Sequence, residues 1–234
     1  MNIWNMTQNM DRPHSVVDHS KSVEWYLENP YCNVHDRMRS LYELVSNRSS
    51  YVDMKLIFMD VEFNRDGSFR FAHIRTRKPN EESVGEYDIW GRDKDIDKLA
   101  TIIKDADVIF MYGCGNDLRA LTDAGLDTKL LRTKLIDIQD QYLSVIHRGY
   151  SRLESMSRFY GGPSKYRKRN FSGKEVRKQC ISDVLMLIHL VDITLNGDLV
   201  KGTLFEDYMQ DLEKRETINA LASAKGDPIQ ISTL

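Results

Sequence analysis

The stretch Lys55-Leu-Ile-Phe-Met-Asp-Val-Glu-Phe63 is an apolar run that ends in two acids, Asp60 and Glu62. A short apolar run of this kind is typical of a buried β-strand. Residues two apart in a strand point to the same face, so both carboxylates should leave the strand on one side. Two carboxylates so placed repel each other unless a cation lies between them. The strand end is therefore a candidate metal site.

Working outward from this strand, the residue pattern predicts three strands followed by alternating helices and strands. We expect strands at residues 54–63, 69–74, 85–90, 108–112 and 135–138, and helices at 93–104, 117–124, 152–160 and 173–195. An Asp-Gly pair in the turn at 64–67 indicates a hairpin between the first two strands. This order predicts an α/β fold with a mixed five-stranded sheet flanked by helices.

The domain organisation expected from these patterns has one central domain and two extensions. Residues 51–197 should form the α/β domain, residues 1–50 an N-terminal helical extension, and residues 198–234 a C-terminal helix and tail. His14, His19, Cys32 and His35 in the first extension are either ligands of a metal ion or scattered surface residues, and both readings stay open. The terminal helices could bind a protein partner or pair with a second copy of the chain.

The composition is that of an ordinary soluble protein. The chain has 234 residues, 41% apolar and 29% charged, with a net charge of −2, which argues against binding nucleic acid by bulk charge alone. Its three cysteines include no Cys-x-x-Cys pair, so a reducing intracellular location, in the cytoplasm or nucleus, fits best. The start lacks the pattern of a signal peptide, and no apolar stretch approaches the roughly 18 residues of a membrane span.

Two further acids should join Asp60 and Glu62. Asp117 opens a helix that follows a strand, and Asp183 lies on the apolar face of the long late helix. A carboxylate on a buried face is costly unless it is paired or binds a metal. Four carboxylates at the carboxyl ends of central strands predict a site for Mg²⁺ or Mn²⁺. The alternative is that these residues are an ordinary strand end and surface acids of helices.

A cluster of this composition suits phosphoryl transfer with two metal ions about 3.5–4 Å apart. One ion activates a water molecule and the other stabilises the leaving oxygen. Asp60 is the natural bridging ligand, because it comes from the central strand. Glu62 and Asp183 would complete the ion on the nucleophile side, and Asp117 would hold the second ion through water. All four are our candidates for catalytic residues and metal ligands.

The three acidic motifs, in this order, resemble those of the DEDD exonuclease superfamily. The first is the Asp-x-Glu of residues 60–62, and the second is Met111-Tyr-Gly-Cys-Gly-Asn-Asp-Leu-Arg-Ala-Leu-Thr-Asp-Ala-Gly-Leu126, which is most similar to the ribonuclease D and Werner-type branch. The third is Phe171-Ser-Gly-Lys-Glu-Val-Arg-Lys-Gln-Cys-Ile-Ser-Asp183. The resemblance implies a ribonuclease H-like fold and metal-dependent 3′–5′ hydrolysis of RNA or DNA.

The chain departs from that pattern at one position. Active members carry a Tyr four residues, or a His five residues, before the last Asp, and here these are Gln179 and Lys178. Gln is no base, and neighbouring carboxylates raise the pKa of a Lys. Either the enzyme is slow, or His147 or Tyr166 enters the site, or catalysis is lost. The second hypothesis is therefore an adaptor that binds RNA or a protein without cutting.

A basic segment with aromatic residues precedes the third motif. Residues 163–178 hold seven basic side chains and one acid. Such a segment can bind the phosphate backbone and stack on the bases of single-stranded RNA or DNA. The alternative is a solvated loop. The residues that we expect to contact nucleic acid are Tyr166, Arg167, Lys168, Arg169, Lys174 and Lys178.

Overall fold

The computed structural model describes residues 47–78, 84–91, 93–139, 152–167 and 170–196, together with the isolated positions 210, 214, 217, 220 and 221. Those isolated positions are helical. The predicted N-terminal helical extension and the predicted C-terminal helix and tail lie largely outside the described residues and stay predictions. The predicted roles of His14, His19, Cys32, His35, His147, Lys168 and Arg169 also lie outside the described residues.

A short 3-10 helix and three strands come first along the described chain, and α-helices follow the third strand. The elements are η2 (Arg48–Asp53), β1 (Leu56–Phe63), β2 (Phe69–Arg77), β3 (Val84–Trp90), α3 (Asp93–Lys104), β4 (Val108–Met111), α4 (Gly115–Asp123), α5 (Thr128–Lys134), β5 (Leu135–Asp137), α7 (Leu153–Phe159) and α8 (Gly173–Asn196).

The strands form one mixed five-stranded sheet in the order β3-β2-β1-β4-β5, as the sequence predicts. β1 and β3 pair antiparallel with β2, whereas β4 is parallel to both β1 and β5. The turn between β1 and β2 contains Gly67 at φ +83°, a left-handed conformation that favours glycine. Because β1 and β4 are parallel neighbours, their carboxyl ends lie at the same edge of the sheet.

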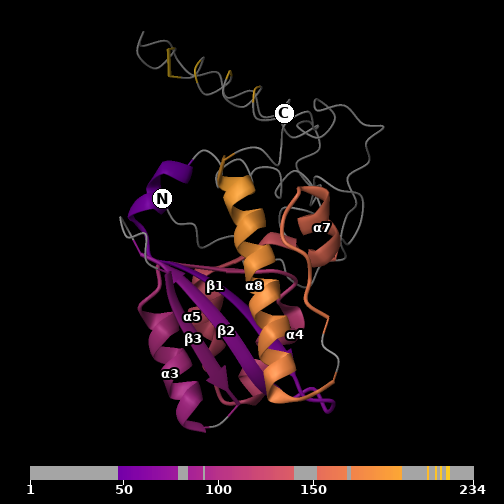
Figure 1. Cartoon of the computed structure of the whole chain (residues 1–234). Helices are drawn as coiled ribbons and strands as arrows, with labels where there is room; N and C mark the ends of the chain where they lie inside the picture. Colours follow the sequence, from indigo (N-terminus) through magenta and orange to yellow (C-terminus); the bar gives the residue numbers. More distant parts are fainter. Residues whose placement is uncertain are drawn as a thin grey trace, which may run out of the picture.

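Alternation along β1 divides its side chains between two layers of the molecule. Ile57 and Met59 pack into the core beneath α3, α4 and α5, with residues such as Leu99. On the opposite face Phe58 stacks on Phe110, with ring centroids 5.6 Å apart. Figure 1 shows α8 running across that second face. Asp60 and Glu62 therefore leave β1 toward α8, because they share the parity of Phe58.

Helix α8 is the one described helix that could cross a membrane by length and composition. It packs instead against β1, β2 and α7. Its face includes Val184, Leu187 and Leu190, which are almost completely buried. This is the character of a core helix, and the described residues form an α/β domain. Burial of this helix also carries Asp183 to the sheet.

The sequence did not indicate α5, which begins after Asp127. The Asp127 carboxylate accepts a hydrogen bond from the backbone N–H of Lys129 at 3.0 Å and so caps the helix. The helix has seven residues, too few for a clear periodic signal. Helix α4 also begins earlier than expected, at Gly115, so Asp117 lies within its first turn rather than at its start.

The contact between α8 and the sheet should depend on Phe71. This side chain is fully buried against Val176 and Cys180 of α8, and its ring centroid lies 4.5 Å from that of Trp90. Phe71→Ala should lower the free energy of unfolding by about 3–5 kcal/mol, as measured in urea, because it leaves a cavity. Phe159→Ala is the control, since Phe159 is 72% exposed. Equal losses in the two variants would contradict this packing.

Candidate metal centre

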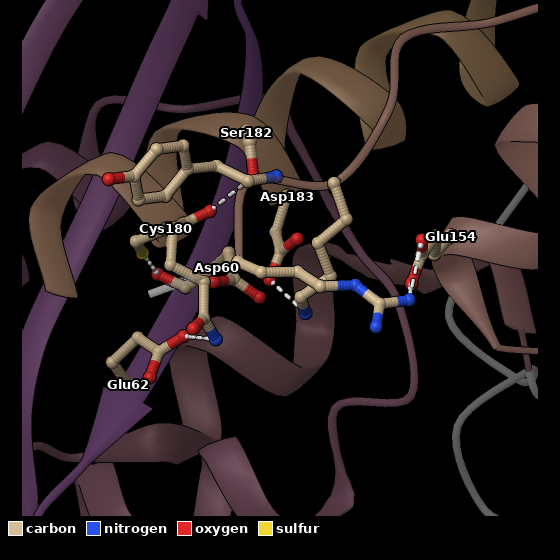
Figure 2. Close-up of polar contacts among 10 residues, drawn as sticks. Asp60, Glu62, Glu154, Cys180, Ser182 and Asp183 are labelled. Carbon is tan, nitrogen blue, oxygen red and sulfur yellow. Dashed lines mark hydrogen bonds and ion pairs between the residues drawn. The ribbon is translucent and has the colours of Figure 1, made fainter. Parts of the chain in front are cut away.

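Three of the four predicted acids come together where β1 passes α8. One carboxylate oxygen each from Asp60, Glu62 and Asp183 lies within 4.8 Å of the others. Figure 2 shows Asp60 and Glu62 of β1 gathered beside Asp183 of α8. We call these three residues the acidic group. The structure thus brings together residues that are more than 120 positions apart in the sequence.

Two residues of the acidic group are buried, the third, Asp60, is half-buried, and the hydrogen bonding of the group is incomplete. Glu62 is 9% exposed and Asp183 is 4% exposed. Asp60 Oδ2 and Asp183 Oδ1 are buried, and neither accepts a hydrogen bond from any residue that the structure describes. Buried carboxylate oxygens without partners are unfavourable in a folded protein. Three carboxylates in this arrangement could hold a metal ion.

Burial and mutual repulsion both change the pKa values of these acids. Burial is the main cause that raises the pKa of Asp60 well above its usual value, and the charges of Asp183, Asp117 and Glu62 add to it. The pKa of Asp183 is raised to about 6, mainly by burial, although Lys165 opposes the rise. The acidic group therefore resists carrying its full negative charge unless a cation is present.

Asp117 lies near the acidic group without belonging to it. It is 9% exposed in the first turn of α4, and its charge acts on Asp60. Burial, then Asp137 and then Glu62 raise the pKa of Asp117 to about 8. The structure therefore places the fourth predicted acid at the edge of the site, where a second cation would have to lie between Asp60 and Asp117.

Asp137 is a residue that the sequence analysis missed, and it shapes the approach to α4. Its carboxylate is buried and accepts hydrogen bonds from the backbone N–H groups of Gly113 at 2.8 Å and Cys114 at 2.7 Å. Gly113 has φ +67°, so the turn before α4 uses a left-handed residue. Asp137 thus holds the turn that presents Asp117. The available signal was an acid inside the apolar run at 135–138.

The two residues in the place of the missing base have different surroundings. Gln179 donates a hydrogen bond from Nε2 to Glu62 Oε1, so it lies in the site as a neutral donor. Lys178 lies outside the acidic group: its Nζ is 3.6 Å from Glu175 and 5.2 Å from the ring centroid of Tyr166. Gln179 orients a carboxylate, and it has no basic atom to take a proton from water.

Tyr166 does not reach the acids either. Its hydroxyl donates to Glu175 Oε2 at 2.7 Å, and its backbone N–H donates to Ser182 Oγ at 2.9 Å. The suggestion that Tyr166 supplies the missing base is therefore not supported by its position. The ring remains on the surface side of the loop beside Lys178, where a role in binding nucleic acid stays a prediction.

Lys165 is the second residue that the sequence analysis did not assign. Its Nζ donates to Asp183 Oδ2 at 2.7 Å. Burial disfavours the ammonium, but Asp183, Asp60 and Glu62 outweigh burial, so the pKa of Lys165 is raised. The site therefore contains a positive charge supplied by the chain. The signal was its place as the first basic residue of the segment 163–178.

The other basic residues of that segment do not converge on the acidic group. The Arg167 side chain is 80% exposed and lies 3.3 Å from Glu154 of α7. Lys174 is exposed on the first turn of α8. The described basic side chains thus surround the site loosely, and Lys165 alone among those of segment 163–178 donates a hydrogen bond to it.

The arrangement as a whole could hold a metal ion. The three acids of the acidic group could be ligands, Asp117 lies at their edge, and Gln179 and Lys165 supply hydrogen-bond donors. No protein-family model, no curated protein and no solved structure matches the chain. The chemistry of the site and the motif pattern are therefore what bear on function.

Asp117 should destabilise the protein when no metal is present. With EDTA present, we expect Asp117→Asn to raise the free energy of unfolding above pH 8, because the uncharged amide removes a buried charge. The gain should shrink as the pH falls from about 8 toward the usual range of aspartate, since the folded state then protonates Asp117. Asp123→Asn, on the exposed side of α4, is the control. An equal gain at all pH values would contradict this account.

Asp137 should stabilise the fold, because its carboxylate accepts two backbone hydrogen bonds. Asp137→Ala leaves the N–H groups of Gly113 and Cys114 without their acceptor, and we expect a loss of about 1–3 kcal/mol in the free energy of unfolding. Amide hydrogen exchange should also become faster in the first turn of α4. Unchanged exchange at 113–117 would show that another contact holds this turn.

Proposed function

We propose that this protein is a metal-dependent 3′–5′ exonuclease that hydrolyses phosphodiester bonds of single-stranded RNA or DNA. The observation that carries the proposal is the pair of buried oxygens without partners, Asp60 Oδ2 and Asp183 Oδ1, within the acidic group. A stable fold keeps such groups only where something compensates their cost, and a divalent cation does so. Metal centres built from carboxylates are well suited to phosphoryl transfer.

The arrangement of the fold supports the same proposal. Three antiparallel strands followed by two parallel ones, in the order β3-β2-β1-β4-β5, are what a ribonuclease H-like domain requires. Each acidic motif lies on the expected element: Asp60 and Glu62 on β1, Asp117 on α4 and Asp183 on α8. A ribonuclease H-like fold, with DEDD-type motifs, is therefore part of the proposal.

The chain's own residues have distinct tasks in this scheme. Asp60, Glu62 and Asp183 would hold one Mg²⁺ or Mn²⁺, and Asp117 would help to hold a second. Such ions lower the pKa of a water molecule and stabilise charge on the leaving oxygen. Gln179 keeps the Glu62 carboxylate oriented. Tyr166, Arg167, Lys174 and Lys178 would bind the phosphates and bases of the strand, as would Lys168 and Arg169.

The absence of a base predicts a slow enzyme. No described side chain is placed to accept a proton from water at the acidic group, because Gln179 is neutral and the Tyr166 hydroxyl bonds Glu175. General-base help contributes about 10²–10⁴-fold in typical enzymes. Turnover should therefore be lower by about that factor than in an enzyme with a Tyr or His there.

The same observation favours a second candidate function, an adaptor. A domain that keeps the acids but lacks a base could bind RNA, a protein partner or a second copy of the chain without cutting. Both functions place the protein inside the cell, where nucleic acid and reduced cysteines occur together. They differ in one measurable property, which is loss of nucleotides from the 3′ end.

The test is a cleavage assay on 5′-labelled single-stranded RNA and DNA with Mg²⁺ or Mn²⁺. We expect products shortened stepwise from the 3′ end, no products with EDTA, and none with Asp60→Asn. Asp123→Asn is the matched control and should cut like the unaltered protein, because Asp123 is exposed at the end of α4. Intact substrate together with a gel shift would reject the enzyme and support the adaptor.

A further inference from the structure

The ammonium group of Lys165 forms an ion pair with Asp183, which is one of the proposed metal ligands. Its Nζ lies 2.7 Å from Asp183 Oδ2, and the side chains are 30% and 6% exposed. This is a partly buried ion pair rather than a loose surface contact. Lys165 thus brings a positive charge directly to one member of the acidic group.

The loop that carries Lys165 is anchored on both sides of it. Before it, the hydroxyl of the buried Ser157 donates to the carbonyl oxygen of Pro163 at 2.8 Å. After it, the backbone N–H of Tyr166 donates to Ser182 Oγ, one residue before Asp183. These anchors direct the ammonium toward Asp183. The ion pair is therefore built into the path of the chain between α7 and α8.

The two carboxylate oxygens of Asp183 have different surroundings. Oδ2 accepts from Lys165, whereas Oδ1 is buried without a partner, as is Asp60 Oδ2. A divalent cation bound by those free oxygens would share the Asp183 carboxylate with Lys165. Two positive charges at one carboxylate, shielded from water, repel each other strongly. Metal binding and the Lys165 contact are thus opposed.

We propose that Lys165 competes with the divalent cation for Asp183, so that metal binding displaces its ammonium from the acidic group. This inference rests on the proposed function. Without metal, Lys165 offsets part of the repulsion among the acids. With metal, the ammonium is released but stays tethered by the anchored loop, beside Tyr166 and Arg167, where a substrate phosphate is its natural acceptor.

The direct test is calorimetric titration with Mn²⁺. Lys165→Met and Lys165→Gln remove the charge, and each should bind Mn²⁺ about tenfold or more tightly than the unaltered protein. Gln keeps a hydrogen-bond donor for Asp183, so it covers the case in which Met impairs folding. Lys165→Arg should keep the weaker binding. Lys129→Met, an equal change of charge on the exposed side of α5, should leave Mn²⁺ affinity unchanged.

Thermal unfolding supplies a second readout that needs no substrate. In EDTA, Lys165→Met should unfold at a lower temperature than the unaltered protein, because Asp183 loses its partner. In saturating Mn²⁺ its stabilisation should exceed that of the unaltered protein, since bound ligand stabilises in proportion to the logarithm of affinity. A variant that is less stable in EDTA but gains more stability from Mn²⁺ indicates competition. A purely structural role of Lys165 would lower the stability without increasing the gain from Mn²⁺.

Each result has one meaning. Equal Mn²⁺ affinity in Lys165→Gln and the unaltered protein overturns the competition and leaves the proposed function standing. Weaker binding in that variant also overturns it, and assigns Lys165 the task of orienting Asp183. If neither the unaltered protein nor the Lys165 variants bind Mn²⁺, the metal-dependent function falls and the inference falls with it.

Discussion

Repulsion among buried carboxylates is the constraint on which this structure depends. β1 delivers two acids to one face, α8 adds a third from that side, and α4 brings a fourth near them. Apolar packing of α8 on the sheet overcomes this repulsion, because burial of a helix face is worth far more than one unfavourable charge pair. The fold thus stores an electrostatic cost at one edge, as functional sites often do.

The chain offsets that cost only in part. Gln179 donates to Glu62, and Lys165 donates to Asp183, so two of the three acids have a side-chain donor. The Cys180 thiol donates to the backbone carbonyl oxygen of Asp60, but Asp60 Oδ2 has no hydrogen-bond partner among the described residues. A cation is what would complete this arrangement. Under the proposed function, the difference between an enzyme and an adaptor depends on how a water molecule loses its proton at this site.

Local patterns predicted most of the described fold. The apolar run at 54–63, the Asp-Gly turn and the helical period of 93–104 each reflect neighbours in sequence, and the structure confirms them as β1, the hairpin turn and α3. Helix α5 was not predicted, because its seven residues are too few to show a helical period. The role of Asp137 in holding the turn before α4 was not predicted, because the N–H groups that it binds, those of Gly113 and Cys114, lie on another segment of the chain.

The sequence by itself determined where three of the acids lie: strand periodicity places Asp60 and Glu62 on one face, and helix periodicity turns Asp183 inward. Only the tertiary structure decided which side chains meet them. Lys165 reaches Asp183, whereas the ring of Tyr166, the next residue, turns to Glu175. These contacts follow from the hydrogen bonds that hold an irregular loop in place. An irregular loop has no periodic residue pattern, so the sequence could not predict which side chains contact the acids.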